Sequence, residues 1–365
     1  MLILASIALL VLLEVSTRRK IIHTQKNRSR SSSSVVLQRK STPDLAKDTA
    51  CIDEEESSVI RAFELNGFYV QKLTLSEDRG ERLGENSNKS LDDCLQTGKA
   101  SIAWSKYPPS VQGHPWQRLN SIPNQDMFDD YAVITQALSE YSNENNIPIE
   151  FLPGIHQANT GLTFQGNEIS LRAYFLIASV DPLIVLYHPG YLNTSRSDGT
   201  KGVTGLDEWE IDLNQYVNRN SNVFTTSIRS NPLDHIHQQV MDAQSIIVSS
   251  LRSKAFVHPA SMENGFTIIA TDFKIDAKLN VWLSNIESNL HFSDNDVTKS
   301  ENDDQILSST IILLTSIRKK ESQGEPIIPL KQIGRFRPVY TDSFQFRYKF
   351  PRIVRTQSTE RKRQR

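Results

Sequence analysis

The sequence predicts an α/β fold, and three stretches of the chain carry that prediction. Residues 57–104 have the pattern helix, strand, polar excursion and short strand, which is typical of an open α/β sheet. Residues 231–252 have the apolar spacing of a buried helix. Residues 266–286 contain two β-rich runs joined by a polar turn, which is typical of a hairpin. Helices and strands are thus expected throughout the chain.

Composition limits the classes of function. The 365 residues are enough for one large domain or two modest ones with a substantial core. Because the formal net charge is −1, charge alone does not favour nucleic acid as a partner, and we expect none. The two cysteines, Cys51 and Cys94, lack the spacing of a metal site or a disulfide framework. We therefore expect both to be free thiols.

The first 23 residues are expected to direct the chain to a membrane or the secretory pathway. Met1–Leu13 is a continuous apolar run followed by Arg18, Arg19 and Lys20. It is shorter than the roughly 20 residues that cross a bilayer, and it lacks the basic start of a signal peptide. A signal peptide, a membrane anchor and a wrongly assigned start codon all remain open. Localisation in the cytoplasm or at the cytoskeleton is the alternative.

A polar tether and a small α/β region are expected next. Residues 24–58 are polar and without periodicity, which favours a disordered tether. Ser57–Asn66 is predicted to be a helix that ends at Gly67, and Phe68–Leu75 a strand. Ala100–Trp104 is a second short strand. Gln125–Tyr141 is a helix whose apolar stripe belongs to the core.

The second half of the chain begins with a predicted hairpin over residues 169–187, in which Asp181-Pro182 starts the turn. The helix at 231–252 carries His235 and His237. Two helical residues that are two apart face different directions and cannot hold one metal ion, so we expect both at the surface. A helix over residues 303–317 follows the hairpin at 266–286.

The last 45 residues, 321–365, are basic and contain interleaved aromatic side chains. Such a tail can bind nucleic acid, acidic protein segments or anionic lipid, and it can also be simply solvated. Without further residues to decide among them, these alternatives stay open.

Polar side chains at the ends of the predicted hairpin form the candidate site. Asp272 leaves the first strand, and Asn285, Glu287 and Asn289 leave the second. Their spacing of two places the last three on one face of a strand. Oxygen ligands that converge from paired strands suit a hard cation such as Mg²⁺, which in turn holds nucleotide phosphates.

This hairpin resembles the closing hairpin of the tubulin–tyrosine ligase-like family of ATP-grasp enzymes. The family pattern is close to F-x-x-x-G-F-D-F-x-x-D-x-x-L-x-x-W-L-x-E-x-N-x-N-P. The matching positions, without a gap, are Phe266, Asp272, Phe273, Asp276, Leu279, Trp282, Leu283 and Asn289. The chain departs at Ala270, Asn285, Glu287 and Leu290, so that the family's E-x-N metal pair reads N-x-E here.

Two further segments extend the resemblance. The run Ile169–Leu176 is similar to the family's K-F-D-L-R-V-Y-V-L, and it implies that Arg172 meets phosphate and acts in catalysis. The run Leu213–Asn218 is similar to H-L-T-N-Y-S-I-N, which implies that Asn214 lies close to nucleotide and metal. The resemblance implies a small α/β N-terminal subdomain at 59–155 and an ATP-grasp-like ligase domain at 156–320.

What the resemblance implies is ATP- and Mg²⁺-dependent ligation of an amino acid to a carboxylate of tubulin. Asp272, Glu287 and Asn285 would hold the metal, and Arg172, Asn214 and Asn289 would contact the nucleotide. However, the chain has no lysine between Lys106 and Lys201, and no glycine-rich loop follows Pro153. A catalytically dead binding module at microtubules or membranes is therefore the rival interpretation. A third is that residues are missing between Pro153 and Glu168.

Overall fold

A computed structural model describes residues 49–53, 56–73, 91–105, 113–114, 116–152, 162–164, 167–195, 201–256, 264–292 and 297–341. The apolar run at Met1–Leu13, most of the tether and the end of the basic segment lie outside these residues. Within the described part, no helix combines the length and apolar character needed to cross a bilayer.

A small parallel sheet forms the N-terminal part of the described chain. Its strand order is β2-β1-β3-β4. The strands are β1 (Thr49–Asp53), β2 (Tyr69–Leu73), β3 (Ile102–Trp104) and β4 (Arg118–Leu119). Helix α2 (Ser57–Leu65) connects β1 to β2, and α3 (Leu91–Thr97) precedes β3. The expected tether over 24–58 is thus wrong at its end, since Ala50 and Ile52 are buried in a strand.

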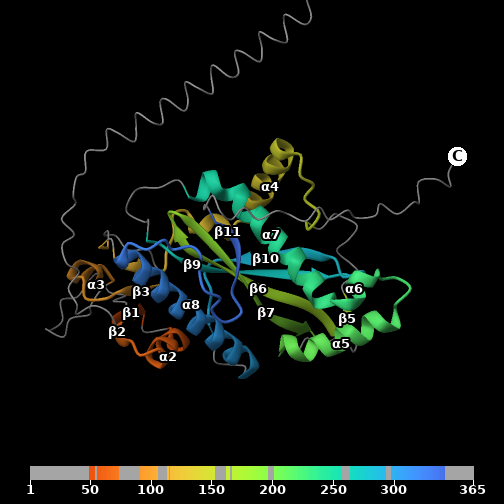
Figure 1. The fold of residues 1–365 in the computed structure, drawn as a ribbon, viewed down its shortest axis with the longest axis horizontal. Coiled ribbons are helices and arrows are strands. Elements are labelled where there is room, and N and C mark those ends of the chain that lie inside the picture. Colours follow the sequence, from red (N-terminus) through yellow and green to blue (C-terminus); the bar gives the residue numbers. More distant parts are fainter. Residues whose placement is uncertain are drawn as a thin grey trace, which may run out of the picture. The chain divides into compact units, whose positions relative to one another are not determined.

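A larger, antiparallel sheet forms the centre of the structure (Figure 1). Its main path is β10-β9-β6-β7-β11, with β5 paired to β6 and β8 paired to β7. The bounds are β5 (Thr163–Phe164), β6 (Asn167–Val180), β7 (Leu183–Ser195), β8 (Lys201–Thr204), β9 (Thr267–Ile275), β10 (Val281–Glu287) and β11 (Arg337–Thr341). Both hairpins expected from the sequence are present, and the mixed α/β fold class is confirmed.

Strand β11 corrects the expected basic tail. Residues 337–341 pair with β7, and Val339 is fully buried in the core of the large sheet. Burial of this side chain draws the segment into the fold even though basic residues surround it. The segment beyond residue 341 lies outside the described residues.

Helices cover the large sheet on both faces. On one face lie α4 (Tyr131–Asn145), α5 (Leu206–Arg219), α6 (Thr226–Ser230) and α7 (Pro232–Ala255), after a short 3₁₀ turn, η2 (Gln125–Phe128). On the other face lies α8 (Val297–Gln323), which packs together with α2. In β6 the side chains alternate between the two cores: Leu171 and Phe175 face α7, whereas Tyr174 and Leu176 face α8.

Helix boundaries follow local chemistry. Asp130 caps α4, because its carboxylate accepts hydrogen bonds from the backbone N–H groups of Ala132 and Val133 at 2.9 and 3.1 Å. Pro232 occupies the first turn of α7, where its missing N–H leaves no helical bond unmade. The helix expected at 231–252 agrees with α7, whereas the helix expected over Gln125–Tyr141 begins later, because Gln125–Phe128 is a 3₁₀ turn and α4 starts at Tyr131.

The expectation of two free cysteines is wrong. Cys51 of β1 and Cys94 of α3 form a disulfide with their Cα atoms 6.6 Å apart. Both side chains are buried, with Leu73 and Ala100 beside them. The pairing depends on how α3 packs against the sheet, and the spacing of 43 residues along the chain carries no signal of it.

His237 also departs from expectation, since it is buried between α7 and the sheet. The hydroxyl of Tyr187 on β7 lies 2.5 Å from its Nδ1 atom. Helix α7 buries side chains over a wider arc than a simple amphipathic stripe, because β7 and β11 both lie against it. A polar side chain on that arc needs an internal partner, and Tyr187 supplies it.

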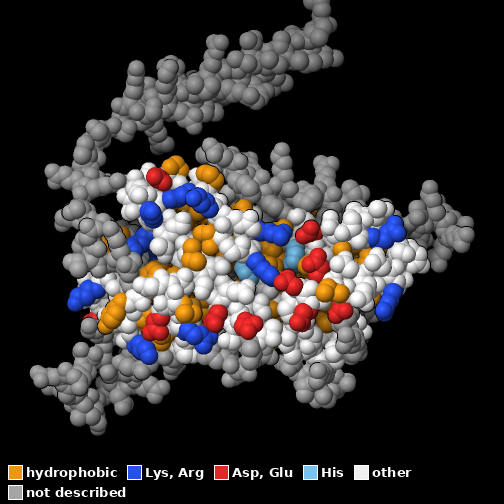
Figure 2. Space-filling model, turned by 60° about the horizontal axis from the view of Figure 1, so that its bottom comes forward, with side chains coloured by type: hydrophobic (Ala, Val, Ile, Leu, Met, Phe, Trp, Pro, Cys, Tyr) orange, Lys and Arg blue, Asp and Glu red, His pale blue; other side chains and the backbone are white. Residues whose placement is uncertain are grey.

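The surface carries both signs of charge. Figure 2 shows acidic and basic side chains interspersed with small hydrophobic groups over one face. On the described part of that face no single sign dominates, in keeping with the net charge of −1.

Candidate functional site

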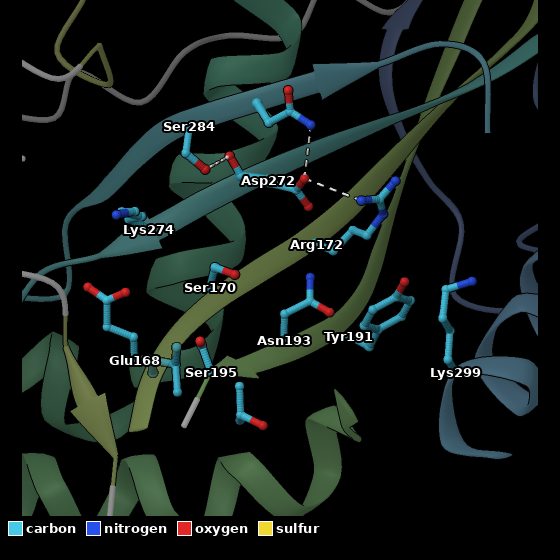
Figure 3. Close-up of a pocket in the computed structure, with 13 residues that line it drawn as sticks. Glu168, Ser170, Arg172, Tyr191, Asn193, Ser195, Asp272, Lys274, Ser284 and Lys299 are labelled. Atoms are coloured by element: carbon cyan, nitrogen blue, oxygen red, sulfur yellow. Dashed lines mark hydrogen bonds and ion pairs between the residues drawn. The ribbon is translucent and has the colours of Figure 1, made fainter. Parts of the chain in front are cut away.

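The candidate site is a cleft of about 410 Å³ on the α8 face of the large sheet. Strands β6, β7, β9 and β10 form its floor with polar side chains, and the first turn of α8 contributes one more (Figure 3). The lining residues are Glu168, Ile169, Ser170, Arg172, Tyr191, Asn193, Thr194, Ser195, Asp272, Lys274, Ser284, Asn285 and Lys299.

Strand register places these side chains together. On β6, Arg172 lies opposite Asp272 of β9 on one side and Tyr191 of β7 on the other. Two residues earlier, Ser170 lies opposite Lys274 and Asn193 in the same way. Because side chains two apart share a face of a strand, the polar pairs form successive rows across the sheet.

Arg172 is the central side chain of the cleft. Its Nη1 donates to Asp272 Oδ2 at 3.3 Å, and its Nη2 donates to Glu287 Oε2. The guanidinium also lies over the ring of Tyr174, 5.9 Å from the centroid. One cationic fork therefore bridges the two carboxylates that were expected to hold a metal ion.

A β-bulge between β9 and β10 brings Asn285 beside Asp272. The register between β9 and β10 shifts between Leu283 and Asn285, and it sets Asn285 directly opposite Asp272. Asn285 Nδ2 then donates to Asp272 Oδ2 at 3.3 Å. The same oxygen thus accepts from both Arg172 and Asn285.

The protonation states follow from burial and from these partners. Burial by itself would lower the pKa of Arg172, but Asp272 and the hydrogen bond to Glu287 raise it above its usual range. Burial raises the pKa of Asp272, although Arg172 and Asn285 oppose that change. The raised pKa of Arg172 favours its charged form, whereas the raised pKa of Asp272 favours its neutral form. We regard the pair as ionised at neutral pH, because contact with a guanidinium favours the carboxylate form.

One carboxylate oxygen of Asp272 has no hydrogen-bond donor in the part of the chain that the structure describes. Its Oδ1 atom is buried and accepts no hydrogen bond from the described residues. A buried acceptor without a donor is unfavourable, so this atom is available to a ligand that carries an N–H or O–H group.

Two lysines that sequence reasoning missed, Lys274 and Lys299, also line the cleft. Lys274 is exposed on β9 and forms no ion pair with the described residues, whereas Lys299 of α8 pairs with the buried Asp303 at 2.9 Å. Lys274 follows Asp272 by two residues, so the period of a strand could have revealed it. Lys299 enters only through the packing of α8, and no local pattern marks it.

Asp303 adds a buried carboxylate beside the cleft. Only 2% of its side chain is exposed, and its Oδ1 atom has no hydrogen-bond donor among the described residues. Burial raises its pKa, although Lys299 opposes that change. Tyr174 and Tyr191 are close enough to feel its charge.

The structure brings together only part of the expected site. Arg172, Asp272, Asn285 and Glu287 meet at one place. Asn214 instead lies on α5, whose buried residues belong to the core on the opposite face of the sheet.

Asn289 is also separate from the cleft. It lines a second cavity of only about 30 Å³ that Trp104, Gln125 and Phe292 share. Its distance in sequence from Glu287 is two residues, but β10 ends at Glu287 and the chain turns away. The strand period therefore no longer applies to Asn289.

The residues do not fit a Mg²⁺ ion in this arrangement. Asp272 and Glu287 each use one oxygen on Arg172, and Asn285 points its N–H₂ group at Asp272. Among the described residues, no group of three or more His, Cys, Asp or Glu side chains is placed to hold a metal ion. The cleft itself, at about 410 Å³, has room for a small ligand, since ligand pockets span roughly 300–1,000 Å³.

No protein-family model matches the chain, and no curated protein matches it in sequence. Among solved structures, it is similar to the C-terminal domain of K. lactis Pby1, described as an ATP-grasp enzyme interacting with the mRNA decapping enzyme Dcp2. The identity is 11% and the TM-score 0.49, and the match covers 80% of this chain and 99% of that chain.

Proposed function

We propose that this chain is a binding module built on an ATP-grasp-like, ligase-type fold. In this proposal the cleft takes a ligand that carries phosphate, which by the family resemblance is a nucleotide. ATP-dependent ligation of an amino acid to a protein carboxylate is weakened or lost. The observation that carries the proposal is the position of Lys274, a cation without an ion pair among the described residues, inside a polar cleft.

Lys274 is suited to phosphate for two reasons. An ammonium group binds phosphate as a point charge, and Ser170 and Asn193 in the same cleft offer hydroxyl and amide donors. Arg172 contributes less, since its charge is already shared with Asp272 and Glu287. The phosphate is therefore expected on the Lys274 side of the cleft.

Ligation is expected to be weak because several contacts of the family are missing. The chain has no lysine between Lys106 and Lys201 and no glycine-rich loop in that interval. Removal of one group that stabilises charge in the transition state costs roughly 3 kcal/mol, about a hundredfold or more in rate. Several such losses lower the rate further, although their effects do not add.

The proposed partner is tubulin or the microtubule, again by the family resemblance. The basic residues near the C-terminus, of which Lys331, Arg335 and Arg337 are described, are the groups that acidic tubulin tails would contact. Microtubule co-sedimentation should then weaken steeply between low and physiological salt, because exposed charges are screened over about 10 Å at 0.1 M. Binding that does not change with salt would contradict the proposed partner.

Nucleotide binding tests the cleft directly. A fluorescent ATP analogue is titrated into the full chain, into Lys274→Met, and into Lys278→Met as the control. Lys278 is exposed on the turn of the same hairpin and does not line the cleft. We expect at least tenfold weaker binding for Lys274→Met and unchanged binding for Lys278→Met. Absence of binding by the wild type, or equal loss in both variants, would overturn the proposal.

Ligation is tested separately with microtubules, Mg-ATP and labelled glutamate, glycine or tyrosine. The expected result is no incorporation above background. Incorporation that disappears in Asp272→Ala would contradict the loss of ligation and would make this chain a working ligase.

A further inference from the structure

We infer that Arg172 is a resident cation of the cleft: it fills the place of a divalent ion between Asp272 and Glu287, so that ligands bind here without metal. The inference deepens the proposed function. It is tested in two ways. The test with a nucleotide rests on nucleotide binding in the cleft, whereas the test with a metal ion rests only on Arg172, Asp272 and Glu287.

The geometry of the fork is the first argument. The two terminal nitrogens of Arg172 each contact a different carboxylate, Asp272 on β9 and Glu287 on β10. The guanidinium is planar and its donors diverge, so one side chain can join two acceptors that no single ammonium group would span in the same way. The backbone of β6 holds this fork beside β9 through the pairing of Arg172 with Asp272.

The sequence departure at β10 is the second argument. The acidic residue lies at position 287, opposite Ala270, and the position directly opposite Asp272 carries an amide. That amide donates to Asp272 and so behaves as a hydrogen-bond donor rather than as an oxygen ligand. The three groups that could surround a cation are therefore all oriented toward each other or toward Arg172.

Burial makes the arrangement resistant to exchange. The exposed fractions of the side chains are 19% for Arg172, 16% for Asp272 and 35% for Glu287. A divalent ion that entered would either lie beside a guanidinium of the same sign or displace it from a partly buried position. Both are unfavourable at short range, since screening by solvent is limited there.

Removal of the guanidinium should reverse this balance. In Arg172→Gln the carboxylates of Asp272 and Glu287 lose their shared cation, and the amide of Asn285 is free to turn its oxygen inward. Two carboxylates and one amide oxygen are a ligand set for a hard divalent ion. The variant is therefore expected to gain a cation site that the wild type lacks.

The test with a metal ion uses Mn²⁺ as the probe, with free Mn²⁺ followed by electron paramagnetic resonance. Four proteins and one matched control are compared: wild type, Asp272→Asn, Arg172→Gln, Arg172→Gln with Asp272→Asn, and the control Arg219→Gln. The control removes an exposed arginine of α5, a helix that packs on the opposite face of the large sheet. We expect wild type, Asp272→Asn and Arg219→Gln to bind Mn²⁺ equally weakly. Arg172→Gln should bind at least tenfold more tightly, and the double variant should lose that gain.

Several results would overturn the inference. One is wild-type Mn²⁺ binding that Asp272→Asn abolishes, and this comparison holds even if Arg172→Gln fails to fold. Another is a folded Arg172→Gln, verified by circular dichroism, that binds Mn²⁺ no better than the wild type. A gain that survives in the double variant would place the ion elsewhere and would also count against it.

The test with a nucleotide measures the fluorescent ATP analogue with excess Mg²⁺ and with excess EDTA. We expect the wild-type affinity to differ by less than threefold between the two conditions. A tenfold or greater dependence on Mg²⁺ would contradict a resident cation. If no nucleotide binds in either condition, the proposed function fails, while the test with a metal ion still decides the role of Arg172.

Discussion

Arg118 of β4 reaches Glu321 near the end of α8, and this pair joins the small sheet to the helix that covers the large one. The arginine is fully buried, with 1% of its side chain exposed, whereas 35% of the glutamate is exposed. Its other terminal nitrogen, Nη1, has no acceptor among the described residues. Glu321 is therefore the group that makes burial of this charge tolerable.

Glu321→Gln should destabilise the protein more than Arg118→Met. The first change leaves a buried charge without a counter-ion, which costs roughly 3 kcal/mol, and less to the extent that water reaches Glu321. The second removes the charge and keeps most of the buried volume. Denaturant unfolding of both variants gives the two free energies. A larger loss for Arg118→Met would show that the pair itself, rather than the lone charge, dominates.

Gly190→Ala should destabilise the large sheet. Gly190 has a φ of +65°, and an added Cβ would lie 1.8 Å from the carbonyl oxygen of Arg172. A left-handed backbone at a residue with a side chain costs about 1–3 kcal/mol before any clash is counted. We therefore expect the free energy of unfolding of Gly190→Ala to fall by at least about 2 kcal/mol.

Gly205→Ala is the control for this change, because a Cβ added there would have no atom within 4 Å and the φ of Gly205 is −63°. Thermal unfolding of both variants makes the comparison. Equal melting temperatures for the two variants would contradict the close approach of β7 to β6 at this point.

Reduction of the disulfide should lower stability. Cys51 and Cys94 are 43 residues apart, and closure of a loop of this length stabilises by about 4 kcal/mol in the chain-entropy account. Urea unfolding with and without dithiothreitol measures the difference. The double variant Cys51→Ser with Cys94→Ser should not respond to the reductant, and a response there would place the effect outside this disulfide.

Stability should fall as pH falls from about 6.5. Burial lowers the pKa of His188 to about 3 and that of His237 to about 4. Below pH 6.5 the unfolded chain takes up protons that the folded chain refuses, so the stability present above pH 6.5 is lost toward the lower, folded pKa. At pH 4, His188 alone accounts for about 3 kcal/mol of that loss.

His188→Asn tests this pH dependence. The Asn carboxamide oxygen can accept the hydrogen bond that the N–H of Gly190 donates to His188 Nδ1 at 3.1 Å, and it does not titrate. The free energy of unfolding of this variant should therefore depend less on pH between 6.5 and 4. An unchanged slope would mean that His188 is protonated in the folded protein.

Local patterns in the sequence were enough to predict the hairpin of β9 and β10, the hairpin of β6 and β7, and helices α4, α7 and α8. These elements depend on apolar periodicity and turn residues that lie close together in the chain. The strand period also predicted that Asp272 and Glu287 belong to one site. Asn289 fails because the strand ends before it, and periodicity cannot show where pairing stops.

Other features were decided only by tertiary packing. The disulfide between Cys51 and Cys94 requires α3 to lie against β1, and the burial of His237 requires Tyr187 as its partner. Strand β11 joins the sheet because Val339 finds a core there. Each outcome depends on an element distant in sequence, so no local window contains the interaction that determines it.

The candidate site divides in the same way. From the sequence by itself, the strand period grouped Asp272, Asn285 and Glu287, and the family resemblance singled out Arg172, whereas Lys274 of β9 was missed. Only the tertiary structure decided what these groups do to one another. The pairing of β6 with β9 sets the guanidinium of Arg172 between two carboxylates, and at that distance each ion pair favours the charged form of both partners.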